Sequence, residues 1–111
     1  TIGSVNQHRR HPELSLYAAT KCAVMSLVEN IAKEVAPFGV TVNNVSPGAI
    51  ATPRNAAVCD DPAARAKVEA CIPVGRFGTP GDCAGIVAFL AGEDSAYITG
   101  ADLRVDGGMS L

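Results

Sequence analysis

The sequence has no Cys-x-x-Cys pair, no long apolar run and no excess of basic residues. A helix that crosses a bilayer needs about 20 apolar residues in succession, so we expect no membrane span, and no signal-peptide pattern is present. The formal net charge of −2 leaves no basic face for nucleic acid or anionic lipid. These absences predict a cytoplasmic protein without nucleic-acid or membrane partners.

The cysteines lack the spacing of a zinc site, because no two are separated by two residues and no histidine stands at ligand spacing from them. We therefore predict no metal site. Cysteines inside apolar segments of a cytoplasmic protein behave as small hydrophobic residues. Reduced, buried thiols are therefore predicted at Cys22, Cys59, Cys71 and Cys83.

What the sequence does contain is the composition of a small globular domain. Its 111 residues are 48% hydrophobic and 18% charged, which favours a packed core over disorder. No repeat, linker or low-complexity tract divides the chain. We therefore expect a single domain over residues 1–111.

Helical and strand patterns alternate along this domain. Apolar residues recur every three to four positions over residues 15–36 and predict a helix there. Helices are also predicted over 62–71 and 80–92, because a polar capping residue followed by proline starts each of them. Short β-branched segments predict strands over 40–45 and 102–106.

The order of these elements predicts an α/β fold. Residues 1–4 would be the end of a first strand, and residues 49–61 would be a loop. Strands separated by helices pair in parallel, with helices on the faces of the sheet. The apolar face of the first helix comprises Leu16, Ala19, Ala23, Leu27, Ile31 and Val35, and the predicted buried side of the last helix comprises Ala84, Val87, Ala88, Leu90 and Ala91.

Tyr17 and Lys21 stand four residues apart in the first predicted helix, so both lie on one face, one turn apart. An isolated phenol is a poor base at neutral pH. A neighbouring cation favours the phenolate, and the pair can then exchange a proton with a carbonyl or alcohol oxygen. Taken alone, the same spacing also fits a solvated contact between the two side chains.

Ser4 precedes this pair at a predicted strand end, where its hydroxyl could meet the same substrate oxygen. Three motifs follow in order: V-N-N-V-S-P-G-A-I-A-T over 42–52, G-R-F-G-T-P-G-D over 75–82 and Y-I-T-G-A-D-L-R-V-D-G-G over 97–108. Together with the spacing of Ser4, Tyr17 and Lys21, they resemble the short-chain dehydrogenase/reductase family along essentially the whole chain. The resemblance implies the C-terminal part of a Rossmann-like, doubly wound parallel sheet, in the order strand stub, helix, strand, helices, strand.

The resemblance also implies an NAD(P)-dependent oxidoreductase that transfers a hydride between nicotinamide and an alcohol or ketone. Tyr17 would be the general acid/base, and Lys21 would assist it and bind the nicotinamide ribose. Ser4 would orient the substrate carbonyl and stabilise charge on its oxygen. Cofactor contacts are implied at Tyr17, Lys21, Pro47, Gly48, Ile50 and Thr52, several of which fall at strand ends, where open α/β sheets bind ligands.

Residues 53–72 correspond to the substrate-binding segment of the family, although an ordinary surface segment explains them equally well. The candidate pocket residues there are Arg54, Asn55, Val58, Ile72 and Val74.

Two further clusters have competing interpretations. The basic run His8, Arg9, Arg10 and His11 could bind an anionic substrate or carrier at the rim of the site, but a solvated loop is the simpler interpretation and the one we prefer. The glycines over 75–81 follow no strand, so we interpret them as a turn before a helix and not as a phosphate-binding loop.

The family pattern includes a dinucleotide-binding half that these 111 residues do not contain. That half supplies the strand, glycine-rich turn and helix that hold the cofactor pyrophosphate. We therefore expect this chain alone to bind neither NAD nor NADP well and to be inactive, and an alternative hypothesis is a truncated, catalytically inactive remnant that folds by oligomerisation.

A homo-oligomer is expected in either case, because the missing half would leave a sheet edge and apolar helix faces open. The segments that build subunit interfaces in the family are all present. A dimer or tetramer would form through the helices over 15–36 and 80–92 and the strand over 102–106.

Overall fold

The computed structural model describes residues 1–9 and 11–111. Its helices are α1 (Ser15–Val35), α2 (Ala56–Cys59), α3 (Pro62–Glu69) and α4 (Pro80–Leu90), and its strands are β1 (Asn44–Pro47) and β2 (Asp102–Val105). Short 3₁₀ turns cover Val5–Gln7, Pro12–Leu14, Ala36–Phe38, Pro53–Asn55 and Glu93–Ser95.

The strands form a small parallel sheet. β1 pairs with β2 from Asn44 opposite Asp102 to Pro47 opposite Val105. Ile2 forms an isolated parallel bridge to β1, which is the predicted strand stub. The parallel sheet and the order of its elements are therefore confirmed.

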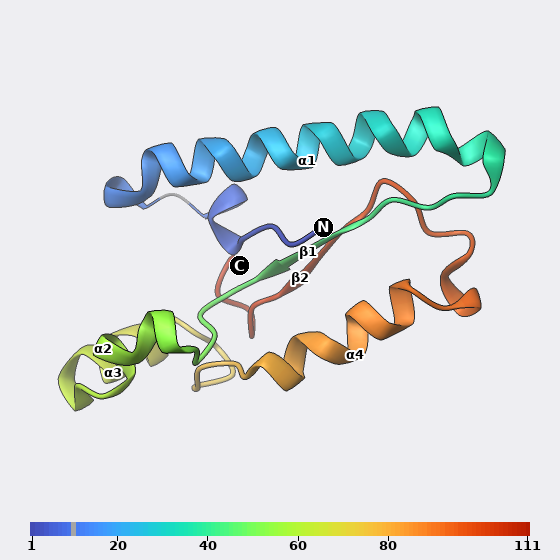
Figure 1. The fold of residues 1–111 in the computed structure, drawn as a ribbon. Coiled ribbons are helices and arrows are strands. Elements are labelled where there is room, and N and C mark those ends of the chain that lie inside the picture. Colours follow the sequence, from blue (N-terminus) through green and yellow to red (C-terminus); the bar gives the residue numbers. More distant parts are fainter. Residues whose placement is uncertain (10) are drawn as a thin grey trace.

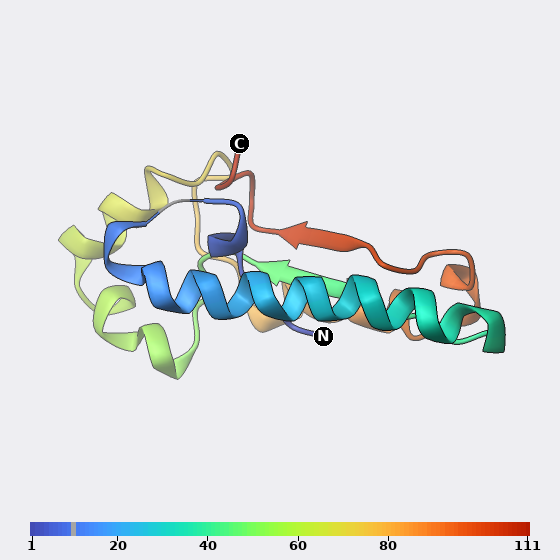
Figure 2. The same cartoon turned by 90° about the horizontal axis from the view of Figure 1, so that it is seen from above.

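Helices cover both faces of this sheet. Figure 1 shows α1 above the strands and α4 below them, and Figure 2 shows α1 running lengthwise over the sheet. The α2 and α3 helices lie beyond the carboxyl end of β1. This three-layer arrangement is the one that a doubly wound sheet requires.

The face of α1 that contacts the sheet differs from the expected apolar stripe. Val28 and Ala32 are the residues of α1 that are fully buried, whereas Leu16 and Leu27 are 79% and 57% exposed. The helix has apolar residues on more than one side, and the sheet covers only one of them. The expectation that an apolar face of this helix would stay open is confirmed.

The strand predicted over 40–45 is wrong in its start, because the ladder begins only at Asn44. Upstream of it, side chains take over part of the pairing. Asn43 Nδ2 donates to the carbonyl oxygen of Ile98, and the backbone N–H of Val42 donates to Thr99 Oγ1. β2 ends one residue earlier than predicted, at Val105.

Both predicted helix starts are confirmed by their caps. Asp61 Oδ1 accepts hydrogen bonds from the backbone N–H groups of Ala63 and Ala64. Thr79 and Asp82 form a reciprocal capping box at the start of α4. The loop predicted over 49–61 is wrong in its second half, where proline at the first position of a 3₁₀ turn leads into α2.

The predicted buried side of α4 is wrong except at Leu90. Ala84, Val87, Ala88 and Ala91 are exposed, whereas Cys83, Ile86 and Leu90 are half-buried. The segment is apolar nearly all round, so its periodicity could not identify the face that meets the sheet.

All four cysteines are free thiols, but they are not buried. Cys22 and Cys71 are exposed, and Cys59 and Cys83 are half-buried. Burial raises the pKa of the Cys83 thiol. Over residues 1–9 and 11–111, no three side chains are placed to hold a metal ion, and no helix is long and apolar enough to span a bilayer.

Candidate active site

A cavity of about 400 Å³ opens beside the carboxyl end of β1. Its lining comes from the segment between Ser4 and the start of α1, the residues that follow β1, and the α2–α3 region, together with Phe77 and Met109. Its volume lies in the range of small-molecule sites. The predicted residues Ser4, Tyr17, Gly48, Arg54, Asn55 and Val58 all line it.

Ser4 is held at the floor of this cavity by local hydrogen bonds. It is buried and caps the 3₁₀ turn over Val5–Gln7, with Oγ accepting from the backbone N–H of Asn6 at 3.2 Å. Gln7 completes the capping box, because its Oε1 accepts from the backbone N–H of Ser4 at 2.8 Å. The serine hydroxyl therefore has a fixed position.

Tyr17 lies half-buried on the first turns of α1, with two cations near its ring. Lys21 Nζ is 5.8 Å from the ring centroid, and the guanidinium carbon of Arg54 is 5.9 Å from it. These distances fall within the range of cation–π contacts. The helical spacing thus brings Lys21 to Tyr17 as predicted, whereas the approach of Arg54 depends on tertiary structure.

Four of the implied cofactor residues lie at the carboxyl end of β1 or just after it. Pro47 ends the strand, and Gly48 lines the cavity with its backbone N–H bonded to Val105. A Cβ on Gly48 would come within 2.7 Å of the Asp106 Cα atom, so glycine is required there. Ile50 faces a neighbouring cavity of about 440 Å³, and Thr52 precedes the 3₁₀ turn over Pro53–Asn55.

The candidate substrate residues separate into two groups. Arg54, Asn55 and Val58 line the cavity beside Tyr17. Ile72 does not: it is only 4% exposed and packs beneath Gly107 as part of the core. Val74 is 61% exposed and lines the neighbouring cavity, so these two predictions are corrected.

The described residues of the basic run over 8–11 also lie in different places. Arg9 and His11 line the cavity, while His8 Nε2 pairs with Asp102 Oδ2 at the edge of β2. Arg10 lies outside the described residues. Sequence reasoning missed seven lining residues: Val5, Asn6, Leu14, Ala49, Val68, Phe77 and Met109. Ala49 and Phe77 lie inside family motifs, but nothing in the sequence indicated that their side chains face the cavity.

A buried polar network connects the sheet to the turn that carries Ser4. The sequence did not indicate this network. Asn44 and Ser46, both on β1, donate hydrogen bonds to Asp102 Oδ1 at 2.7 Å. Ser46 Oγ also lies 3.3 Å from Gln7 Oε1. Burial would by itself raise the pKa of Asp102, but hydrogen bonds from Ser46, His8 and Asn44 outweigh it and lower that pKa. The network thus links β2, β1 and the turn that carries Ser4.

The chain is similar to known proteins along nearly its whole length. Residues 1–110 match the family model described as Enoyl-(Acyl carrier protein) reductase. The chain is 44% identical over 110 residues to 3beta-hydroxysteroid dehydrogenase 1 of Eggerthella lenta, an alignment that covers 99% of this chain and 42% of that protein.

Two solved structures are also similar. A Pseudomonas aeruginosa RhlG/NADP active-site complex is 34% identical with a TM-score of 0.93, and the match covers 99% of this chain and 43% of that one. A 4-hydroxyisoleucine dehydrogenase complexed with NADH is 27% identical with a TM-score of 0.95, covering 99% and 45%. The chain therefore spans less than half the length of these relatives.

Proposed function

Because the chain belongs to the short-chain dehydrogenase/reductase family, we propose that it forms the substrate side of an NAD(P)-dependent oxidoreductase that interconverts an alcohol and a ketone. The observation that carries this proposal is the convergence of Ser4 and Tyr17 on one cavity, with Lys21 beside the Tyr17 ring. Relatives in solved structures are complexed with NADP or NADH.

The three side chains have distinct roles in ketone reduction. Tyr17 donates a hydrogen bond to the carbonyl oxygen and then transfers its proton to that oxygen. Ser4 Oγ already accepts a bond from Asn6, so its own O–H is available to donate to the same oxygen. Donors aimed at an oxygen that gains negative charge lower the barrier of the reaction, and the Lys21 cation favours the phenolate that Tyr17 becomes.

The residues present fit the nicotinamide riboside end of the cofactor. The Lys21 ammonium has three N–H donors, and one of them is used by the carbonyl oxygen of Ile2 at 2.9 Å. The others can serve the ribose hydroxyls. A bound NAD or NADP supplies the hydride donor or acceptor.

The pyrophosphate end of the cofactor has no comparable site in the described part of the chain. There, no strand leads through a glycine-rich turn into a helix N-terminus, the arrangement that binds pyrophosphate. We therefore propose that the 111-residue chain by itself binds NAD or NADP weakly.

The test is hydride transfer by the native protein with NAD or NADP and a panel of alcohols and ketones, followed by the absorbance of reduced nicotinamide. Tyr17→Phe should lower kcat/KM by about 10²–10⁴-fold, the usual contribution of a general acid/base. Tyr97→Phe makes the same change at a fully exposed tyrosine and should have no effect. An active Tyr17→Phe variant would contradict the proposal.

A second candidate is a catalytically inactive, oligomerising remnant. The exposed apolar residues Leu16 and Leu27 on α1 favour it. Self-association without hydride transfer to any substrate of the panel would support this candidate, whereas turnover that depends on Tyr17 would exclude it.

A further inference from the structure

The charged side chains that line the cavity beside Tyr17 are all positive. Arg9 and Arg54 both line it, and none of its lining residues is an aspartate or a glutamate. The chain as a whole carries a net charge of −2, so this local excess of positive charge does not follow from composition.

The two arginines differ from others of the chain in their pairing. Arg65 forms an ion pair with Glu69, and Arg76 forms one with Asp82. Among the residues that the structure describes, Arg9 and Arg54 form no ion pair. Their guanidinium groups therefore keep donors that can bind an anion.

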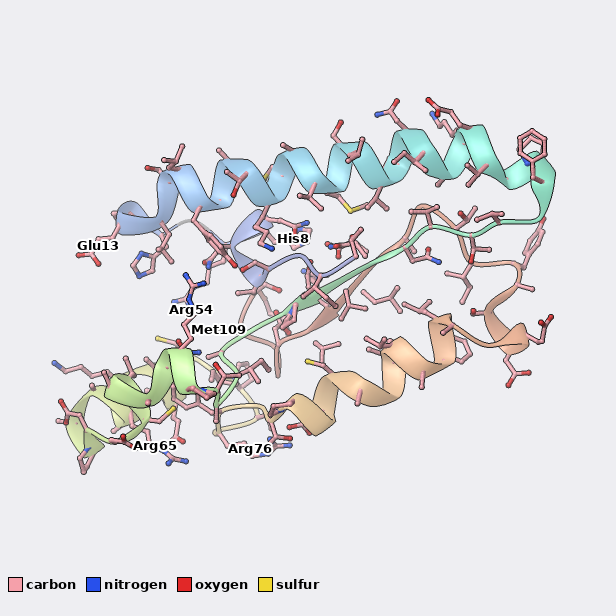
Figure 3. The ribbon with its side chains drawn as sticks, in the orientation of Figure 1. His8, Glu13, Arg54, Arg65, Arg76 and Met109 are labelled. Carbon is pink, nitrogen blue, oxygen red and sulfur yellow. The ribbon has the colours of Figure 1, made fainter. Side chains whose placement is uncertain are left out.

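Arg54 is aimed at the centre of the proposed chemistry. Figure 3 shows its side chain reaching from the 3₁₀ turn before α2 toward the first turn of α1, and its guanidinium carbon lies 5.9 Å from the Tyr17 ring centroid. A small molecule that meets Tyr17 with one oxygen can therefore meet Arg54 with another. His11, on the same rim, adds a third nitrogen-bearing side chain.

We propose that the substrate is a small alcohol or ketone that carries its own anionic group, a carboxylate or a phosphate, bound by Arg54 and Arg9 while its reacting oxygen lies at Tyr17. This inference rests on the proposed function for the reacting oxygen and on the cavity charges for the anion. Arg9 would then bind the substrate and would not belong to a merely solvated loop, the interpretation that the sequence favoured. A cavity of about 400 Å³ suits a small metabolite.

Binding of matched ligand pairs tests the anion without any turnover. One pair is 3-hydroxybutyrate and 3-hydroxybutyramide, and the other is glycerol 3-phosphate and glycerol. In each pair the hydroxyl is kept and the charge is removed. Dissociation constants are measured by NMR titration of the native protein in the absence of cofactor.

We expect at least one anion to bind about tenfold more tightly than its neutral partner, the effect of a charge-assisted hydrogen bond, and raised ionic strength should weaken this preference. Comparing the two pairs identifies a carboxylate or a phosphate as the preferred group. The Arg9→Gln/Arg54→Gln variant should remove the preference, so that the charged and neutral members of each pair bind with equal affinity. Arg65→Gln, which removes one positive charge from a residue that does not line the cavity, should retain it.

Three results would overturn the inference: equal affinity within both pairs, a preference that survives in the Arg9→Gln/Arg54→Gln variant, or no binding of any of the four ligands. Equal affinity would leave the oxidoreductase proposal intact, because neutral alcohols would still bind. Conversely, an anion preference combined with full activity of Tyr17→Phe would retain the anion site and reject the proposed chemistry.

Discussion

Lys21 Nζ donates a hydrogen bond to the backbone carbonyl oxygen of Ile2 at 2.9 Å. Ile2 is the residue that bridges to β1, and Ser4 follows it by two positions. The bond therefore fixes α1, which carries Tyr17, to the segment that carries Ser4. One lysine thus positions the proposed catalytic groups and supplies the cation beside the phenol.

Lys21→Met should lower catalytic activity much more than it lowers the stability of the fold. The variant keeps the aliphatic stem and loses the ammonium, so we expect kcat/KM to fall at least about tenfold through loss of the cation. The free energy of unfolding should fall by only about 1 kcal/mol, the usual net value of one hydrogen bond. Steady-state kinetics and urea denaturation measure the two effects.

Lys33→Met on the same helix is the matched control, because Lys33 is exposed and lies far along α1 from the cavity. It should leave kcat/KM unchanged. Full activity of Lys21→Met would show that Tyr17 works without this cation.

Gly3 and Gly85 should respond to alanine in opposite ways. A Cβ on Gly3 would lie 2.0 Å from Gln7 Oε1 and 2.3 Å from Asn44 Nδ2, whereas a Cβ on Gly85 meets nothing within 4 Å. Gly3→Ala should therefore displace the buried network and cost about 1–3 kcal/mol. Gly85→Ala, in the interior of α4, should stabilise the protein by about 0.5–1 kcal/mol.

Urea denaturation of both glycine variants gives the comparison. Each substitution adds the same methyl group, so a difference in sign comes from the backbone conformation and the surroundings of the two positions. A Gly3→Ala variant as stable as the wild type would show that the turn over Val5–Gln7 shifts at no cost.

Local signals predicted the parts of the fold that depend on neighbours in sequence. The caps at Asp61 and Thr79, and the contact of Lys21 with Tyr17, each involve residues within four positions of each other. The family resemblance supplied Ser4, which no local pattern would identify.

The errors arose where packing decides among equivalent local choices. α4 is apolar on nearly every side, so its sequence could not show that Ala84 and Val87 face solvent. Ile72 was a plausible pocket residue, but in the structure it packs against Gly107 in the core. The polar network also joins residues far apart in sequence, such as Gln7 and Ser46, and no spacing rule predicts such pairs.

Asp102 should make the stability of the fold sensitive to acid. Its pKa is lower in the folded protein than its usual value of 3.8. The contribution of its carboxylate to the free energy of unfolding is therefore complete above about pH 4 and is lost as the pH falls through the folded-state pKa. Asp102→Asn should lower stability by about 1–3 kcal/mol at neutral pH, because it disrupts the bonds from Asn44 and Ser46.

The difference between the wild type and Asp102→Asn should shrink as the pH is lowered below 4, and urea denaturation across this range measures it. Asp94→Asn, at an exposed position, should follow the wild-type curve. A constant difference at every pH would mean that the Asp102 side chain acts through its shape and not through its charge.

The exposed apolar face of α1 should drive self-association of the 111-residue chain. Leu16 and Leu27 are 79% and 57% exposed, and burying one leucine side chain contributes roughly 1.5–3 kcal/mol. Leu27→Lys should therefore raise the dissociation constant of the oligomer by about tenfold or more. Sedimentation velocity over a range of concentrations measures the change.

Ser26→Lys adds the same charge at the neighbouring exposed position and should have a much smaller effect, because it removes no apolar surface. The folded monomer should tolerate both substitutions, since neither position is buried. If Leu27→Lys and Ser26→Lys weaken association equally, charge repulsion is the cause and the apolar face is not the interface. If the wild-type chain is monomeric at every concentration, the face stays open and the chain needs no partner to fold.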